Sequence, residues 1–405
     1  MVVDARALLE ARQMNWNPFA TKNEDAIREF KSHPDVRPDY SRDGDKILHS
    51  WSFTRYLGKT QVFFTRTYDM MSSRIIHVQI VSKVARHIGR VLGFNQDLIE
   101  AIALGHDIGH PPYGHVGEEM LSKISAAGGM GYYWHNYQSI RWLHEIEVHN
   151  LTLQTLDGIL CHNGESKSFE VTTAPVKTFE DMRKEMARIQ STNSKEVLSS
   201  IQPMTPEGCI VRLCDVIAYI GRDIEDAILL KVLRRDEIPE EASAVIGSTN
   251  RQIINSLVND LLQAFIDDYP DLIAAGLGQK KFTVRNDNLL RFRFSPDIRQ
   301  ALSKLMSFNY ERIYLYPEFV EKKELNGPRI EILYNHYLDE FKKQKQDSEI
   351  FTDHIKFTEE YLASRNKTTR YGQTEPPELI VRDFLAGMTE RYFEGLYEKI
   401  RGELI

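Results

Sequence analysis

The sequence predicts an all-α fold, built as one large body with at most a small β-hairpin. Apolar residues recur at three- and four-residue steps along most of the chain, which is the period of an α-helix packed on a core. Strand-like alternation is confined to a few short segments. Hydrophobic residues make up 42% of the 405 residues and charged residues 27%, so the chain can form a sizeable core.

The first forty residues predict an irregular arm. Three prolines interrupt this polar stretch, in which only 23–31 has a short helical pattern. Helical spacing begins in "SRDGDKILHSWSFTRYL" (41–57). The alternating aromatic and β-branched residues of "KTQVFFTRT" (59–67) favour a short hairpin or an extended loop.

The clearest helix is predicted over 74–94. Its apolar residues recur every three or four positions, and Gly93 stands where a helix would end. Asn95 is suited to cap the next helix, "QDLIEAIALGHD". That helix must end before Pro111 and Pro112, because proline disrupts helical hydrogen bonding.

Helical patterns continue to the end of the chain, over 136–149, 151–161, 179–200, 206–234, 249–268, 295–315, 326–346, 354–363 and 377–402. Segments 163–178 and 269–294 lack this pattern, and we expect loops or a small sheet there. The predicted organisation is an N-terminal arm (1–40), a core (41–235) with an insertion of loop and helix at 163–205, and a C-terminal helical region (236–405) packed on the core.

Charge and cysteine content narrow the class of protein. The net charge of −7 argues against a protein that coats nucleic acid, although it does not exclude a small anionic substrate. Three cysteines cannot form a paired disulfide framework. No apolar run approaches the ~18 residues of a membrane helix, and the charged opening residues do not resemble a secretory signal. We therefore expect a cytoplasmic protein without a membrane partner.

Residues that bind divalent cations lie on helices of the predicted core. The segment "LGHDIGHPPYGH" places His106 and Asp107 at a helix end, where both side chains can converge. His77 lies near the start of the preceding helix, which can pack antiparallel and bring the two ends together. Asp215 lies within a long apolar helix, where an unpaired carboxylate would be costly.

Members of this set also have simpler interpretations. His77 alone could be a hydrogen-bonded core histidine, and Asp215 could pair with Arg212. The joint pattern H…HD…D on core helices favours a divalent cation with mixed imidazole and carboxylate ligands instead.

Seven segments, spread from 41 to 397, carry a resemblance to a known family. The sequence resembles the HD-domain superfamily of metal-dependent phosphohydrolases and, within it, the deoxynucleoside triphosphate triphosphohydrolases (the dGTPase-like family). The extension "HDIGHPPYGHVGEE" is specific to that branch. The matching segments are "RDGDKILHSWSFTRYLGKTQV", "SRIIHV", "EAIALGHDIGHPPYGHVGEEML", "HNYQSIRWL", "LTLQTLDGILCHNGE", "IVRLCDVIAYIGRDIEDA" and "FLAGMTERY".

The resemblance implies an HD-domain helical fold with extra C-terminal helices. It also implies one divalent cation, Mn²⁺, Mg²⁺ or Fe²⁺, with four ligands: His77, His106, Asp107 and Asp215. The family reaction cleaves between the nucleoside 5′ oxygen and the α-phosphorus, releasing a deoxynucleoside and inorganic tripolyphosphate.

The remaining histidines of the turn are available for phosphate chemistry, which needs groups that neutralise charge and move protons. If a helix resumes at His115, Glu118 shares a face with it and can orient its ring. The resemblance implies that His110 contacts the phosphates and that the His115–Glu118 pair takes part in catalysis. In the simpler interpretation, His110 only caps the turn.

The resemblance also implies a set of substrate-binding residues. Arg74 would bind phosphate and Gln61 the deoxyribose 3′-hydroxyl, while Asn136 matches a polar position of the family. Tyr219 would pack on the sugar and disfavour a 2′-hydroxyl, with Asp223 on the same helix face. The simpler alternatives are a surface salt bridge for Arg74 and a core role for Tyr219.

The sequence departs from the family pattern at Tyr137, Val216 and Arg55, none of which is a predicted ligand. The function that fits best is a metal-dependent dNTP triphosphohydrolase. Two alternatives stay open: an HD phosphohydrolase of another nucleotide (a monophosphate or an alarmone), and a regulatory nucleotide- or nucleic-acid-binding protein with a vestigial site. The resemblance further implies a homo-oligomer, tetramer or hexamer, and allows a nucleotide effector or single-stranded nucleic acid as a partner.

Overall fold

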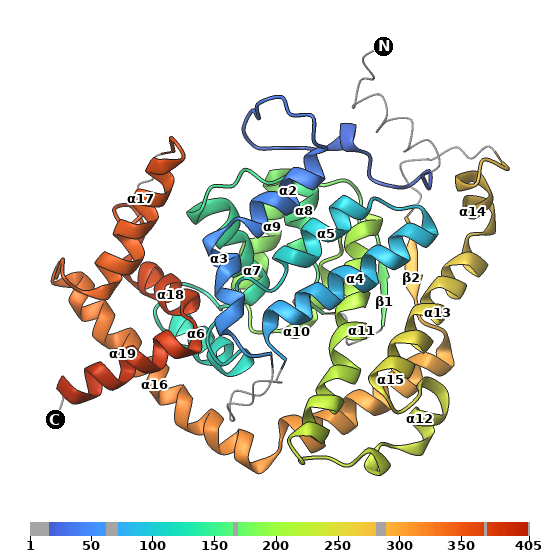
Figure 1. Cartoon of the computed structure of the whole chain (residues 1–405). Helices are drawn as coiled ribbons and strands as arrows, with labels where there is room; N and C mark the ends of the chain where they lie inside the picture. The colour runs from blue at the N-terminus through green and yellow to red at the C-terminus, as the bar shows by residue number, and fades with distance from the viewer. Residues whose placement is uncertain (1–15, 62–71, 165–168, 281–288, 368–370, 404–405) are drawn as a thin grey trace.

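A computed structural model of the protein describes residues 16–61, 72–164, 169–280, 289–367 and 371–403. Nearly all regular structure in these residues is helical (Figure 1), which confirms the all-α prediction. Among them, no helix is both long and apolar enough to cross a bilayer.

The helices up to the middle of the chain are α2 (Asp39–Leu48), α3 (Trp51–Thr54), α4 (Arg74–Leu92), α5 (Gln96–Gly105), α6 (His115–Ala127), α7 (His135–Ile140), α8 (Leu153–Leu160), α9 (Phe179–Gln190), α10 (Lys195–Ser200) and α11 (Pro206–Leu229). They are followed by α12 (Glu240–Ile246), α13 (Asn250–Asp268), α14 (Pro270–Gly276), α15 (Pro296–Asn309), α16 (Pro317–Lys342), α17 (Phe357–Ser364), α18 (Pro377–Gly387) and α19 (Glu390–Glu403). Short 3₁₀ or π turns occur at Asn23–Asp25, Arg55–Gly58, Arg141–Ile146, Arg235–Glu237, Tyr310–Tyr314 and Ile350–Lys356.

The boundary between α4 and α5 forms as the sequence predicts. Gly93 ends α4 with φ 79°, a left-handed conformation that glycine adopts without a steric penalty. The Asn95 side chain accepts hydrogen bonds from the amides of Asp97 and Leu98 and thereby caps α5. The two helices consequently reverse direction within three residues and pack against each other.

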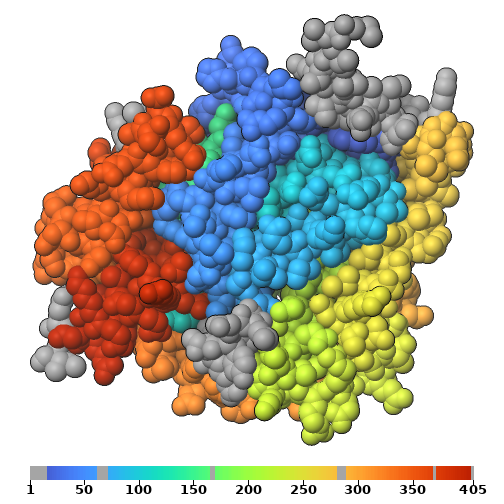
Figure 2. Space-filling view, viewed as in Figure 1, coloured from blue at the N-terminus to red at the C-terminus, as the bar shows by residue number. Residues whose placement is uncertain are grey.

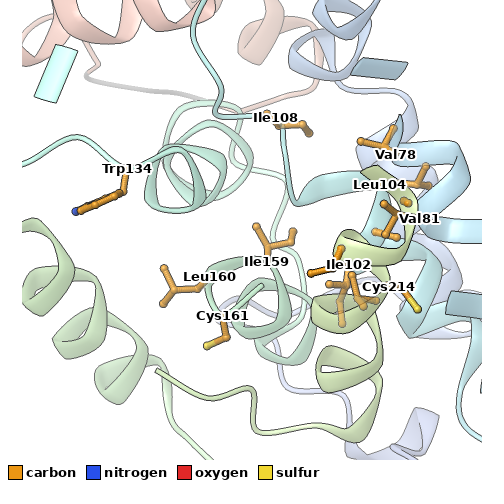
Figure 3. Close-up of a cluster of buried hydrophobic side chains, with 14 of the residues drawn as sticks. Val78, Val81, Ile102, Leu104, Ile108, Trp134, Ile159, Leu160, Cys161 and Cys214 are labelled. Atoms are coloured by element: carbon orange, nitrogen blue, oxygen red, sulfur yellow. The ribbon is translucent and has the colours of Figure 1, made fainter. Parts of the chain in front are cut away.

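The centre of the core lies where α4, α5, α8 and α11 meet. Figure 3 shows Val81 of α4, Ile102 of α5 and Cys214 of α11 gathered together, with Ile159 of α8 beside them. All four side chains are completely buried. Because polar groups in such a core must find partners, the histidines and aspartates on these same helices need a specific arrangement.

The only sheet in the described residues has two antiparallel strands, β1 (Glu170–Thr172) and β2 (Arg291–Arg293), with Val171 opposite Phe292. Both strands lie in the segments 163–178 and 269–294, where loops or a small sheet are expected, and they pair with each other across the chain rather than as a hairpin of adjacent strands. Phe292 is fully buried and stacks on Phe265 at 4.9 Å, so tertiary packing places this strand. Of the other expected extended segment, Thr60 bridges Ser73, and 62–67 lies outside the described residues.

Several helix boundaries differ from prediction. The helix expected over 23–31 shrinks to a single turn, because Arg28 instead binds Asp39 and Asp43. The patterns 179–200 and 377–402 each form two helices, and α16 begins nine residues before the expected 326. The short helices α12 and α14 were not expected; a proline lies at the first turn or cap of each.

The C-terminal helices extend the core on two sides. In Figure 1, α16 runs along the lower edge of the molecule, from the group of α12, α13 and α15 to α18 and α19. It contacts α6, α18 and α19. Figure 2 shows the C-terminal helices (red) against the N-terminal third of the chain (blue). The domain boundaries at 40 and 235 stay predictions.

Candidate metal centre

The four predicted ligands come together from three core helices. His77 lies in the first turn of α4, His106 and Asp107 follow the last turn of α5, and Asp215 lies in the middle of α11. The His77 Nε2 atom is 2.9 Å from Asp215 Oδ1 and 4.0 Å from Asp107 Oδ2. The His106 Nε2 atom is 3.6 Å from Asp107 Oδ1 and 3.8 Å from Asp215 Oδ1. The antiparallel α4–α5 pair therefore juxtaposes the helix ends as the sequence suggests.

The donor set fits a divalent cation. His106 Nδ1–H donates to the Ala103 carbonyl at 2.8 Å, which leaves a lone pair on Nε2. That Nε2 atom is completely buried and has no hydrogen-bond partner in the described part of the chain, although an unsatisfied buried polar atom is costly. A cation accepting this lone pair, with Asp107 and Asp215 as oxygen ligands, satisfies it. Imidazole and carboxylate ligands are suited to Mn²⁺, Fe²⁺ or Mg²⁺, whereas a structural zinc site usually has thiolate ligands.

The carboxylates of the centre are already ionised before a metal binds. Burial alone would raise the pKa of Asp107, but His110, Arg74 and His106 hold it well below its usual range. Arg74 Nη1 donates to Asp107 Oδ2 at 2.5 Å. Burial likewise opposes the ionised form of Asp215, but His77 keeps its pKa at about 2. A cation would therefore meet two charged oxygen ligands, one from Asp107 and one from Asp215.

The turn between α5 and α6, residues 106–114 (the HD turn), separates its histidines. Tyr113 and Gly114 adopt positive φ angles of 63° and 54°, and α6 then begins at His115 as predicted. His110 points inward and is buried, with its Nδ1 atom 3.1 Å from Asp107 Oδ1, whereas 84% of the His115 side chain is exposed. His110 of the HD turn thus faces the centre, whereas His115, directly after the turn, faces outward.

Glu118 connects the outer imidazole to an inner one. Its Oε2 atom accepts from His115 Nδ1 at 3.2 Å, the pairing that the sequence predicts. Its Oε1 atom accepts from the His135 amide at 2.8 Å and from His135 Nδ1 at 2.9 Å. Although burial opposes ionisation, His135 and His115 hold the pKa of Glu118 well below its usual range, so it is a carboxylate.

Sequence reasoning missed His135 and His162, which both line the centre. The His135 ring stacks on His110 with centroids 3.8 Å apart, and its Nε2 atom lies 3.1 Å from His162 Nε2. His162 Nδ1–H donates to the Ile159 carbonyl, so His162 Nε2 accepts from His135. His162 also lies close enough to His106 and Asp215 to share a cation with them. Both residues lie in segments that resemble the family, but sequence spacing gives no sign that they meet.

The predicted substrate residues Arg74, Gln61 and Asn136 differ in whether their polar atoms are already hydrogen-bonded. Arg74 is buried against Asp107, so the alternative of a surface salt bridge is wrong. The Gln61 Oε1 atom is buried and has no hydrogen-bond partner among the residues that the structure describes. Asn136 Nδ2 donates to the Leu160 carbonyl at 2.6 Å, which links α7 to α8, while its buried Oδ1 atom has no hydrogen-bond partner among the described residues.

Tyr219 and Asp223 share one face of α11 with Asp215, as predicted. The Asp223 carboxylate accepts from Tyr314 Oη at 2.5 Å, a contact that the sequence did not indicate. Burial raises the pKa of Asp223 to about 7. Arg212, the alternative partner for Asp215, donates to the carbonyls of Cys161 and Ile201.

Comparison with known proteins is consistent with this geometry. The HD domain profile matches residues 74–220, the interval that contains all four predicted ligands. A deoxyguanosinetriphosphate triphosphohydrolase-like protein of Caldanaerobacter subterraneus is 30% identical over 390 residues, which cover 95% of this chain and 91% of the relative. The chain belongs to this family.

Other members of the dGTPase-like family give the same result. A member from Clostridium perfringens is 34% identical over 76% of this chain and 77% of its own length. A member from Desulfatibacillum aliphaticivorans is 28% identical over 98% of this chain and 97% of its own length. The resemblance stated from the motifs is confirmed, and the protein is a hydrolase of a family of metal-dependent nucleotide triphosphohydrolases that contain an HD domain.

Proposed function

We propose that this protein hydrolyses deoxynucleoside triphosphates to deoxynucleosides and inorganic tripolyphosphate. The observation that carries the proposal is the convergence of His77, His106, Asp107 and Asp215, with the unpartnered lone pair of His106 Nε2 directed into the set. These residues would hold one Mn²⁺, Mg²⁺ or Fe²⁺ ion. When bound, the ion polarises a phosphate oxygen and lowers the pKa of water.

Residues around the centre suit the charge of a triphosphate. Arg74 already faces Asp107 and provides a fixed guanidinium for phosphate oxygens. Burial and the Arg74 charge hold the pKa of His110 well below its usual range, so His110 is neutral near pH 7 and its ring can donate one hydrogen bond and accept another.

Proton transfer is assigned to the His115–Glu118 pair. His115 is exposed at the end of the HD turn, where it can meet the leaving 5′ oxygen of a bound nucleotide. Glu118 accepts from its Nδ1 and so directs Nε2 outward. Tyr219 and Asp223 of α11, with Tyr314 bound to Asp223, are proposed to recognise deoxyribose together with Gln61.

The test is incubation with each dNTP and NTP in the presence of Mn²⁺ or Mg²⁺, with the products separated. Tripolyphosphate and deoxynucleoside are expected from dNTPs, with little turnover of NTPs. Orthophosphate release from a monophosphate or an alarmone would favour the second HD phosphohydrolase function. Binding of nucleotides without hydrolysis under any metal would favour the regulatory alternative.

A cytoplasmic location and a homo-oligomer of four or six copies are also part of the proposal. The location is supported by three cysteines that are all free and buried. The oligomer is supported by the relationship to the dGTPase-like family, and light scattering at micromolar concentration tests it. A nucleotide effector or single-stranded nucleic acid stays open as a partner.

A further inference from the structure

Residues of the C-terminal helix α19 form hydrogen bonds with the HD turn. The Glu390 side chain, at the first residue of α19, reaches back to two separate segments of the core. Its Oε1 atom accepts from the Thr60 amide at 3.1 Å and the Thr60 hydroxyl at 2.7 Å. The same oxygen accepts from the Tyr113 amide at 3.4 Å. One carboxylate oxygen therefore joins the segment before Gln61 to the strained end of the HD turn.

Neighbouring contacts join the same three segments. Lys59 is buried, and its Nζ donates to the carbonyl of His110 and, at 3.1 Å, to the carbonyl of Ala386 at the end of α18. The Tyr113 hydroxyl donates to Glu394, and its ring packs edge-on against Phe393 with centroids 5.3 Å apart. Figure 2 shows the red C-terminal helices beside the blue N-terminal segment on the surface.

The residues bound in this way flank the proposed reaction centre on two sides. Thr60 precedes Gln61, which is proposed to contact deoxyribose. Tyr113 stands between His110 and His115, and its φ of 63° is one that a non-glycine residue adopts only when its surroundings hold it. Errors of about 1 Å in such positions can lower turnover by about 100-fold.

We propose that Glu390 is a positioning residue, whose single acceptor oxygen fixes the Gln61 segment and the HD turn relative to each other. The assignment rests on the proposed function for its kinetic consequence, but the contact itself can be tested without hydrolysis. The acceptor oxygen, rather than the negative charge, carries the role, because all three donors are neutral groups. Burial raises the pKa of Glu390, although the hydrogen bonds from Thr60 and Tyr113 and the Arg74 charge oppose this shift.

Three substitutions separate acceptor from charge. Glu390→Gln keeps an acceptor oxygen at the same distance from the backbone and removes the charge. Glu390→Asp keeps the charge and shortens the side chain by one methylene. Glu390→Leu removes both, and Glu398→Gln, an exposed change on the same helix, is the matched control.

For hydrolysis of a dNTP with Mn²⁺, we expect Glu390→Leu and Glu390→Asp to lower kcat about 10- to 100-fold with KM changed much less. Glu390→Gln should retain most of kcat, and bound metal should stay stoichiometric in all variants. Equal kcat in the Leu variant and the wild type would overturn the proposal. So would an active Asp variant beside an inactive Gln variant, because charge would then be the relevant property.

Amide hydrogen exchange gives the readout that does not depend on activity. The Thr60 and Tyr113 amides should exchange faster in the Leu and Asp variants, and near the wild-type rate in the Gln variant. If the wild type hydrolysed no dNTP, this pattern would still support the positioning contact while the proposed function failed. Unchanged exchange of both amides in the Leu variant would overturn the contact. If the Leu variant does not fold, comparing amide exchange in the Gln and Asp variants tests the proposal.

Discussion

Asp107 is contacted on both of its oxygens before any cation binds. Arg74 donates to Oδ2, and the His110 ring faces Oδ1. His106, by contrast, keeps a buried lone pair that no protein group uses. The two residues therefore differ in what their removal does to the protein. Losing Asp107 leaves Arg74 buried without its carboxylate, whereas losing His106 removes the hydrogen bond to Ala103 and ring packing but leaves no buried charge unpaired.

For this reason His106→Ala is the sharper test of the metal centre. We expect His106→Ala to lose bound Mn²⁺ and hydrolysis while the protein stays folded, with the loss of stability that a core cavity causes. Asp107→Ala should lose the same two properties and also melt earlier. Elemental analysis after gel filtration measures the metal, and calorimetry measures the melting temperature. Stoichiometric metal in both variants would show that the four residues do not form the site.

The second residue-scale prediction concerns His115 and Glu118. Removing a general acid or base typically costs about 10²–10⁴-fold in turnover, so His115→Ala should lower kcat by that amount with metal retained. Glu118→Ala should cost at least as much, because it also releases His135. The double variant should be no worse than Glu118→Ala, since the two side chains act as a unit.

Measuring kcat at saturating substrate, together with metal content and melting temperature, distinguishes a role in acid–base catalysis from a structural role. A metal-loaded, folded His115→Ala protein with full activity would remove His115 from the mechanism. The inner His110 would then be the remaining histidine of the HD turn to provide the acid or base.

At the scale of elements, the HD turn is the part of the site that the sequence predicts best. α5 ends at Gly105, before the two prolines of the turn, and the glycines on either side of these prolines allow what a side chain would block. A Cβ atom on Gly109 would lie 2.0 Å from the His135 carbonyl oxygen and 2.4 Å from the Ser139 amide nitrogen. The HD turn and α7 can pack this closely only because residue 109 lacks a side chain.

Gly109→Ala should therefore force the HD turn away from α7. We expect a loss of about 1–3 kcal/mol of unfolding free energy, as for other overpacked cores, and a fall in turnover because His110 and His135 separate. Gly44→Ala is the matched control, since a Cβ there meets nothing within 4 Å inside α2. It should stabilise the protein by up to about 1 kcal/mol, because alanine favours helix. The denaturation midpoints of the two variants show whether Gly109→Ala destabilises and Gly44→Ala stabilises the protein.

At the scale of the whole molecule, the sequence predicts local features well and distant pairings poorly. Helical period, the Gly93 stop and the Asn95 cap lie within a few residues of the elements that they define. The pairing of β1 with β2 and the contact of His135 with His162 depend on how separate helices pack. The single-turn helix at Asn23–Asp25 shows the same limit, because the Arg28 ion pairs override a local helical pattern.

The four predicted ligands were accessible to sequence reasoning because each stands at a distinctive position on a core helix. Tyr314 and Glu390 were not, since each is an ordinary residue of a C-terminal helix or turn until the fold brings it to the centre. Residues that support the site from the C-terminal region are therefore the ones that only the structure reveals.

One buried histidine is expected to make the stability of the fold depend on pH. His354 is completely buried beside Trp142 and Phe384, and its Nε2–H donates to Tyr371 Oη at 2.7 Å. The Tyr371 hydroxyl in turn donates to Asp383. Burial, together with Arg55 and Arg141, lowers the pKa of His354 to about 3. The folded protein therefore keeps this ring neutral where an unfolded chain would protonate it.

Stability should consequently fall as the pH falls. The contribution of neutral His354 is fully present above the unfolded pKa of ~6.5 and is lost progressively as the pH approaches the folded pKa. At pH 5, about 1.5 units below the unfolded pKa, the free energy of unfolding should be about 2 kcal/mol lower than at neutral pH, since each pH unit contributes about 1.36 kcal/mol. In His354→Gln, which keeps a donor for Tyr371, this part of the pH dependence should vanish. Urea denaturation of metal-free wild type and variant between pH 7 and 5 measures it. Parallel pH profiles for the two proteins would show that His354 does not contribute to the acid sensitivity of the fold.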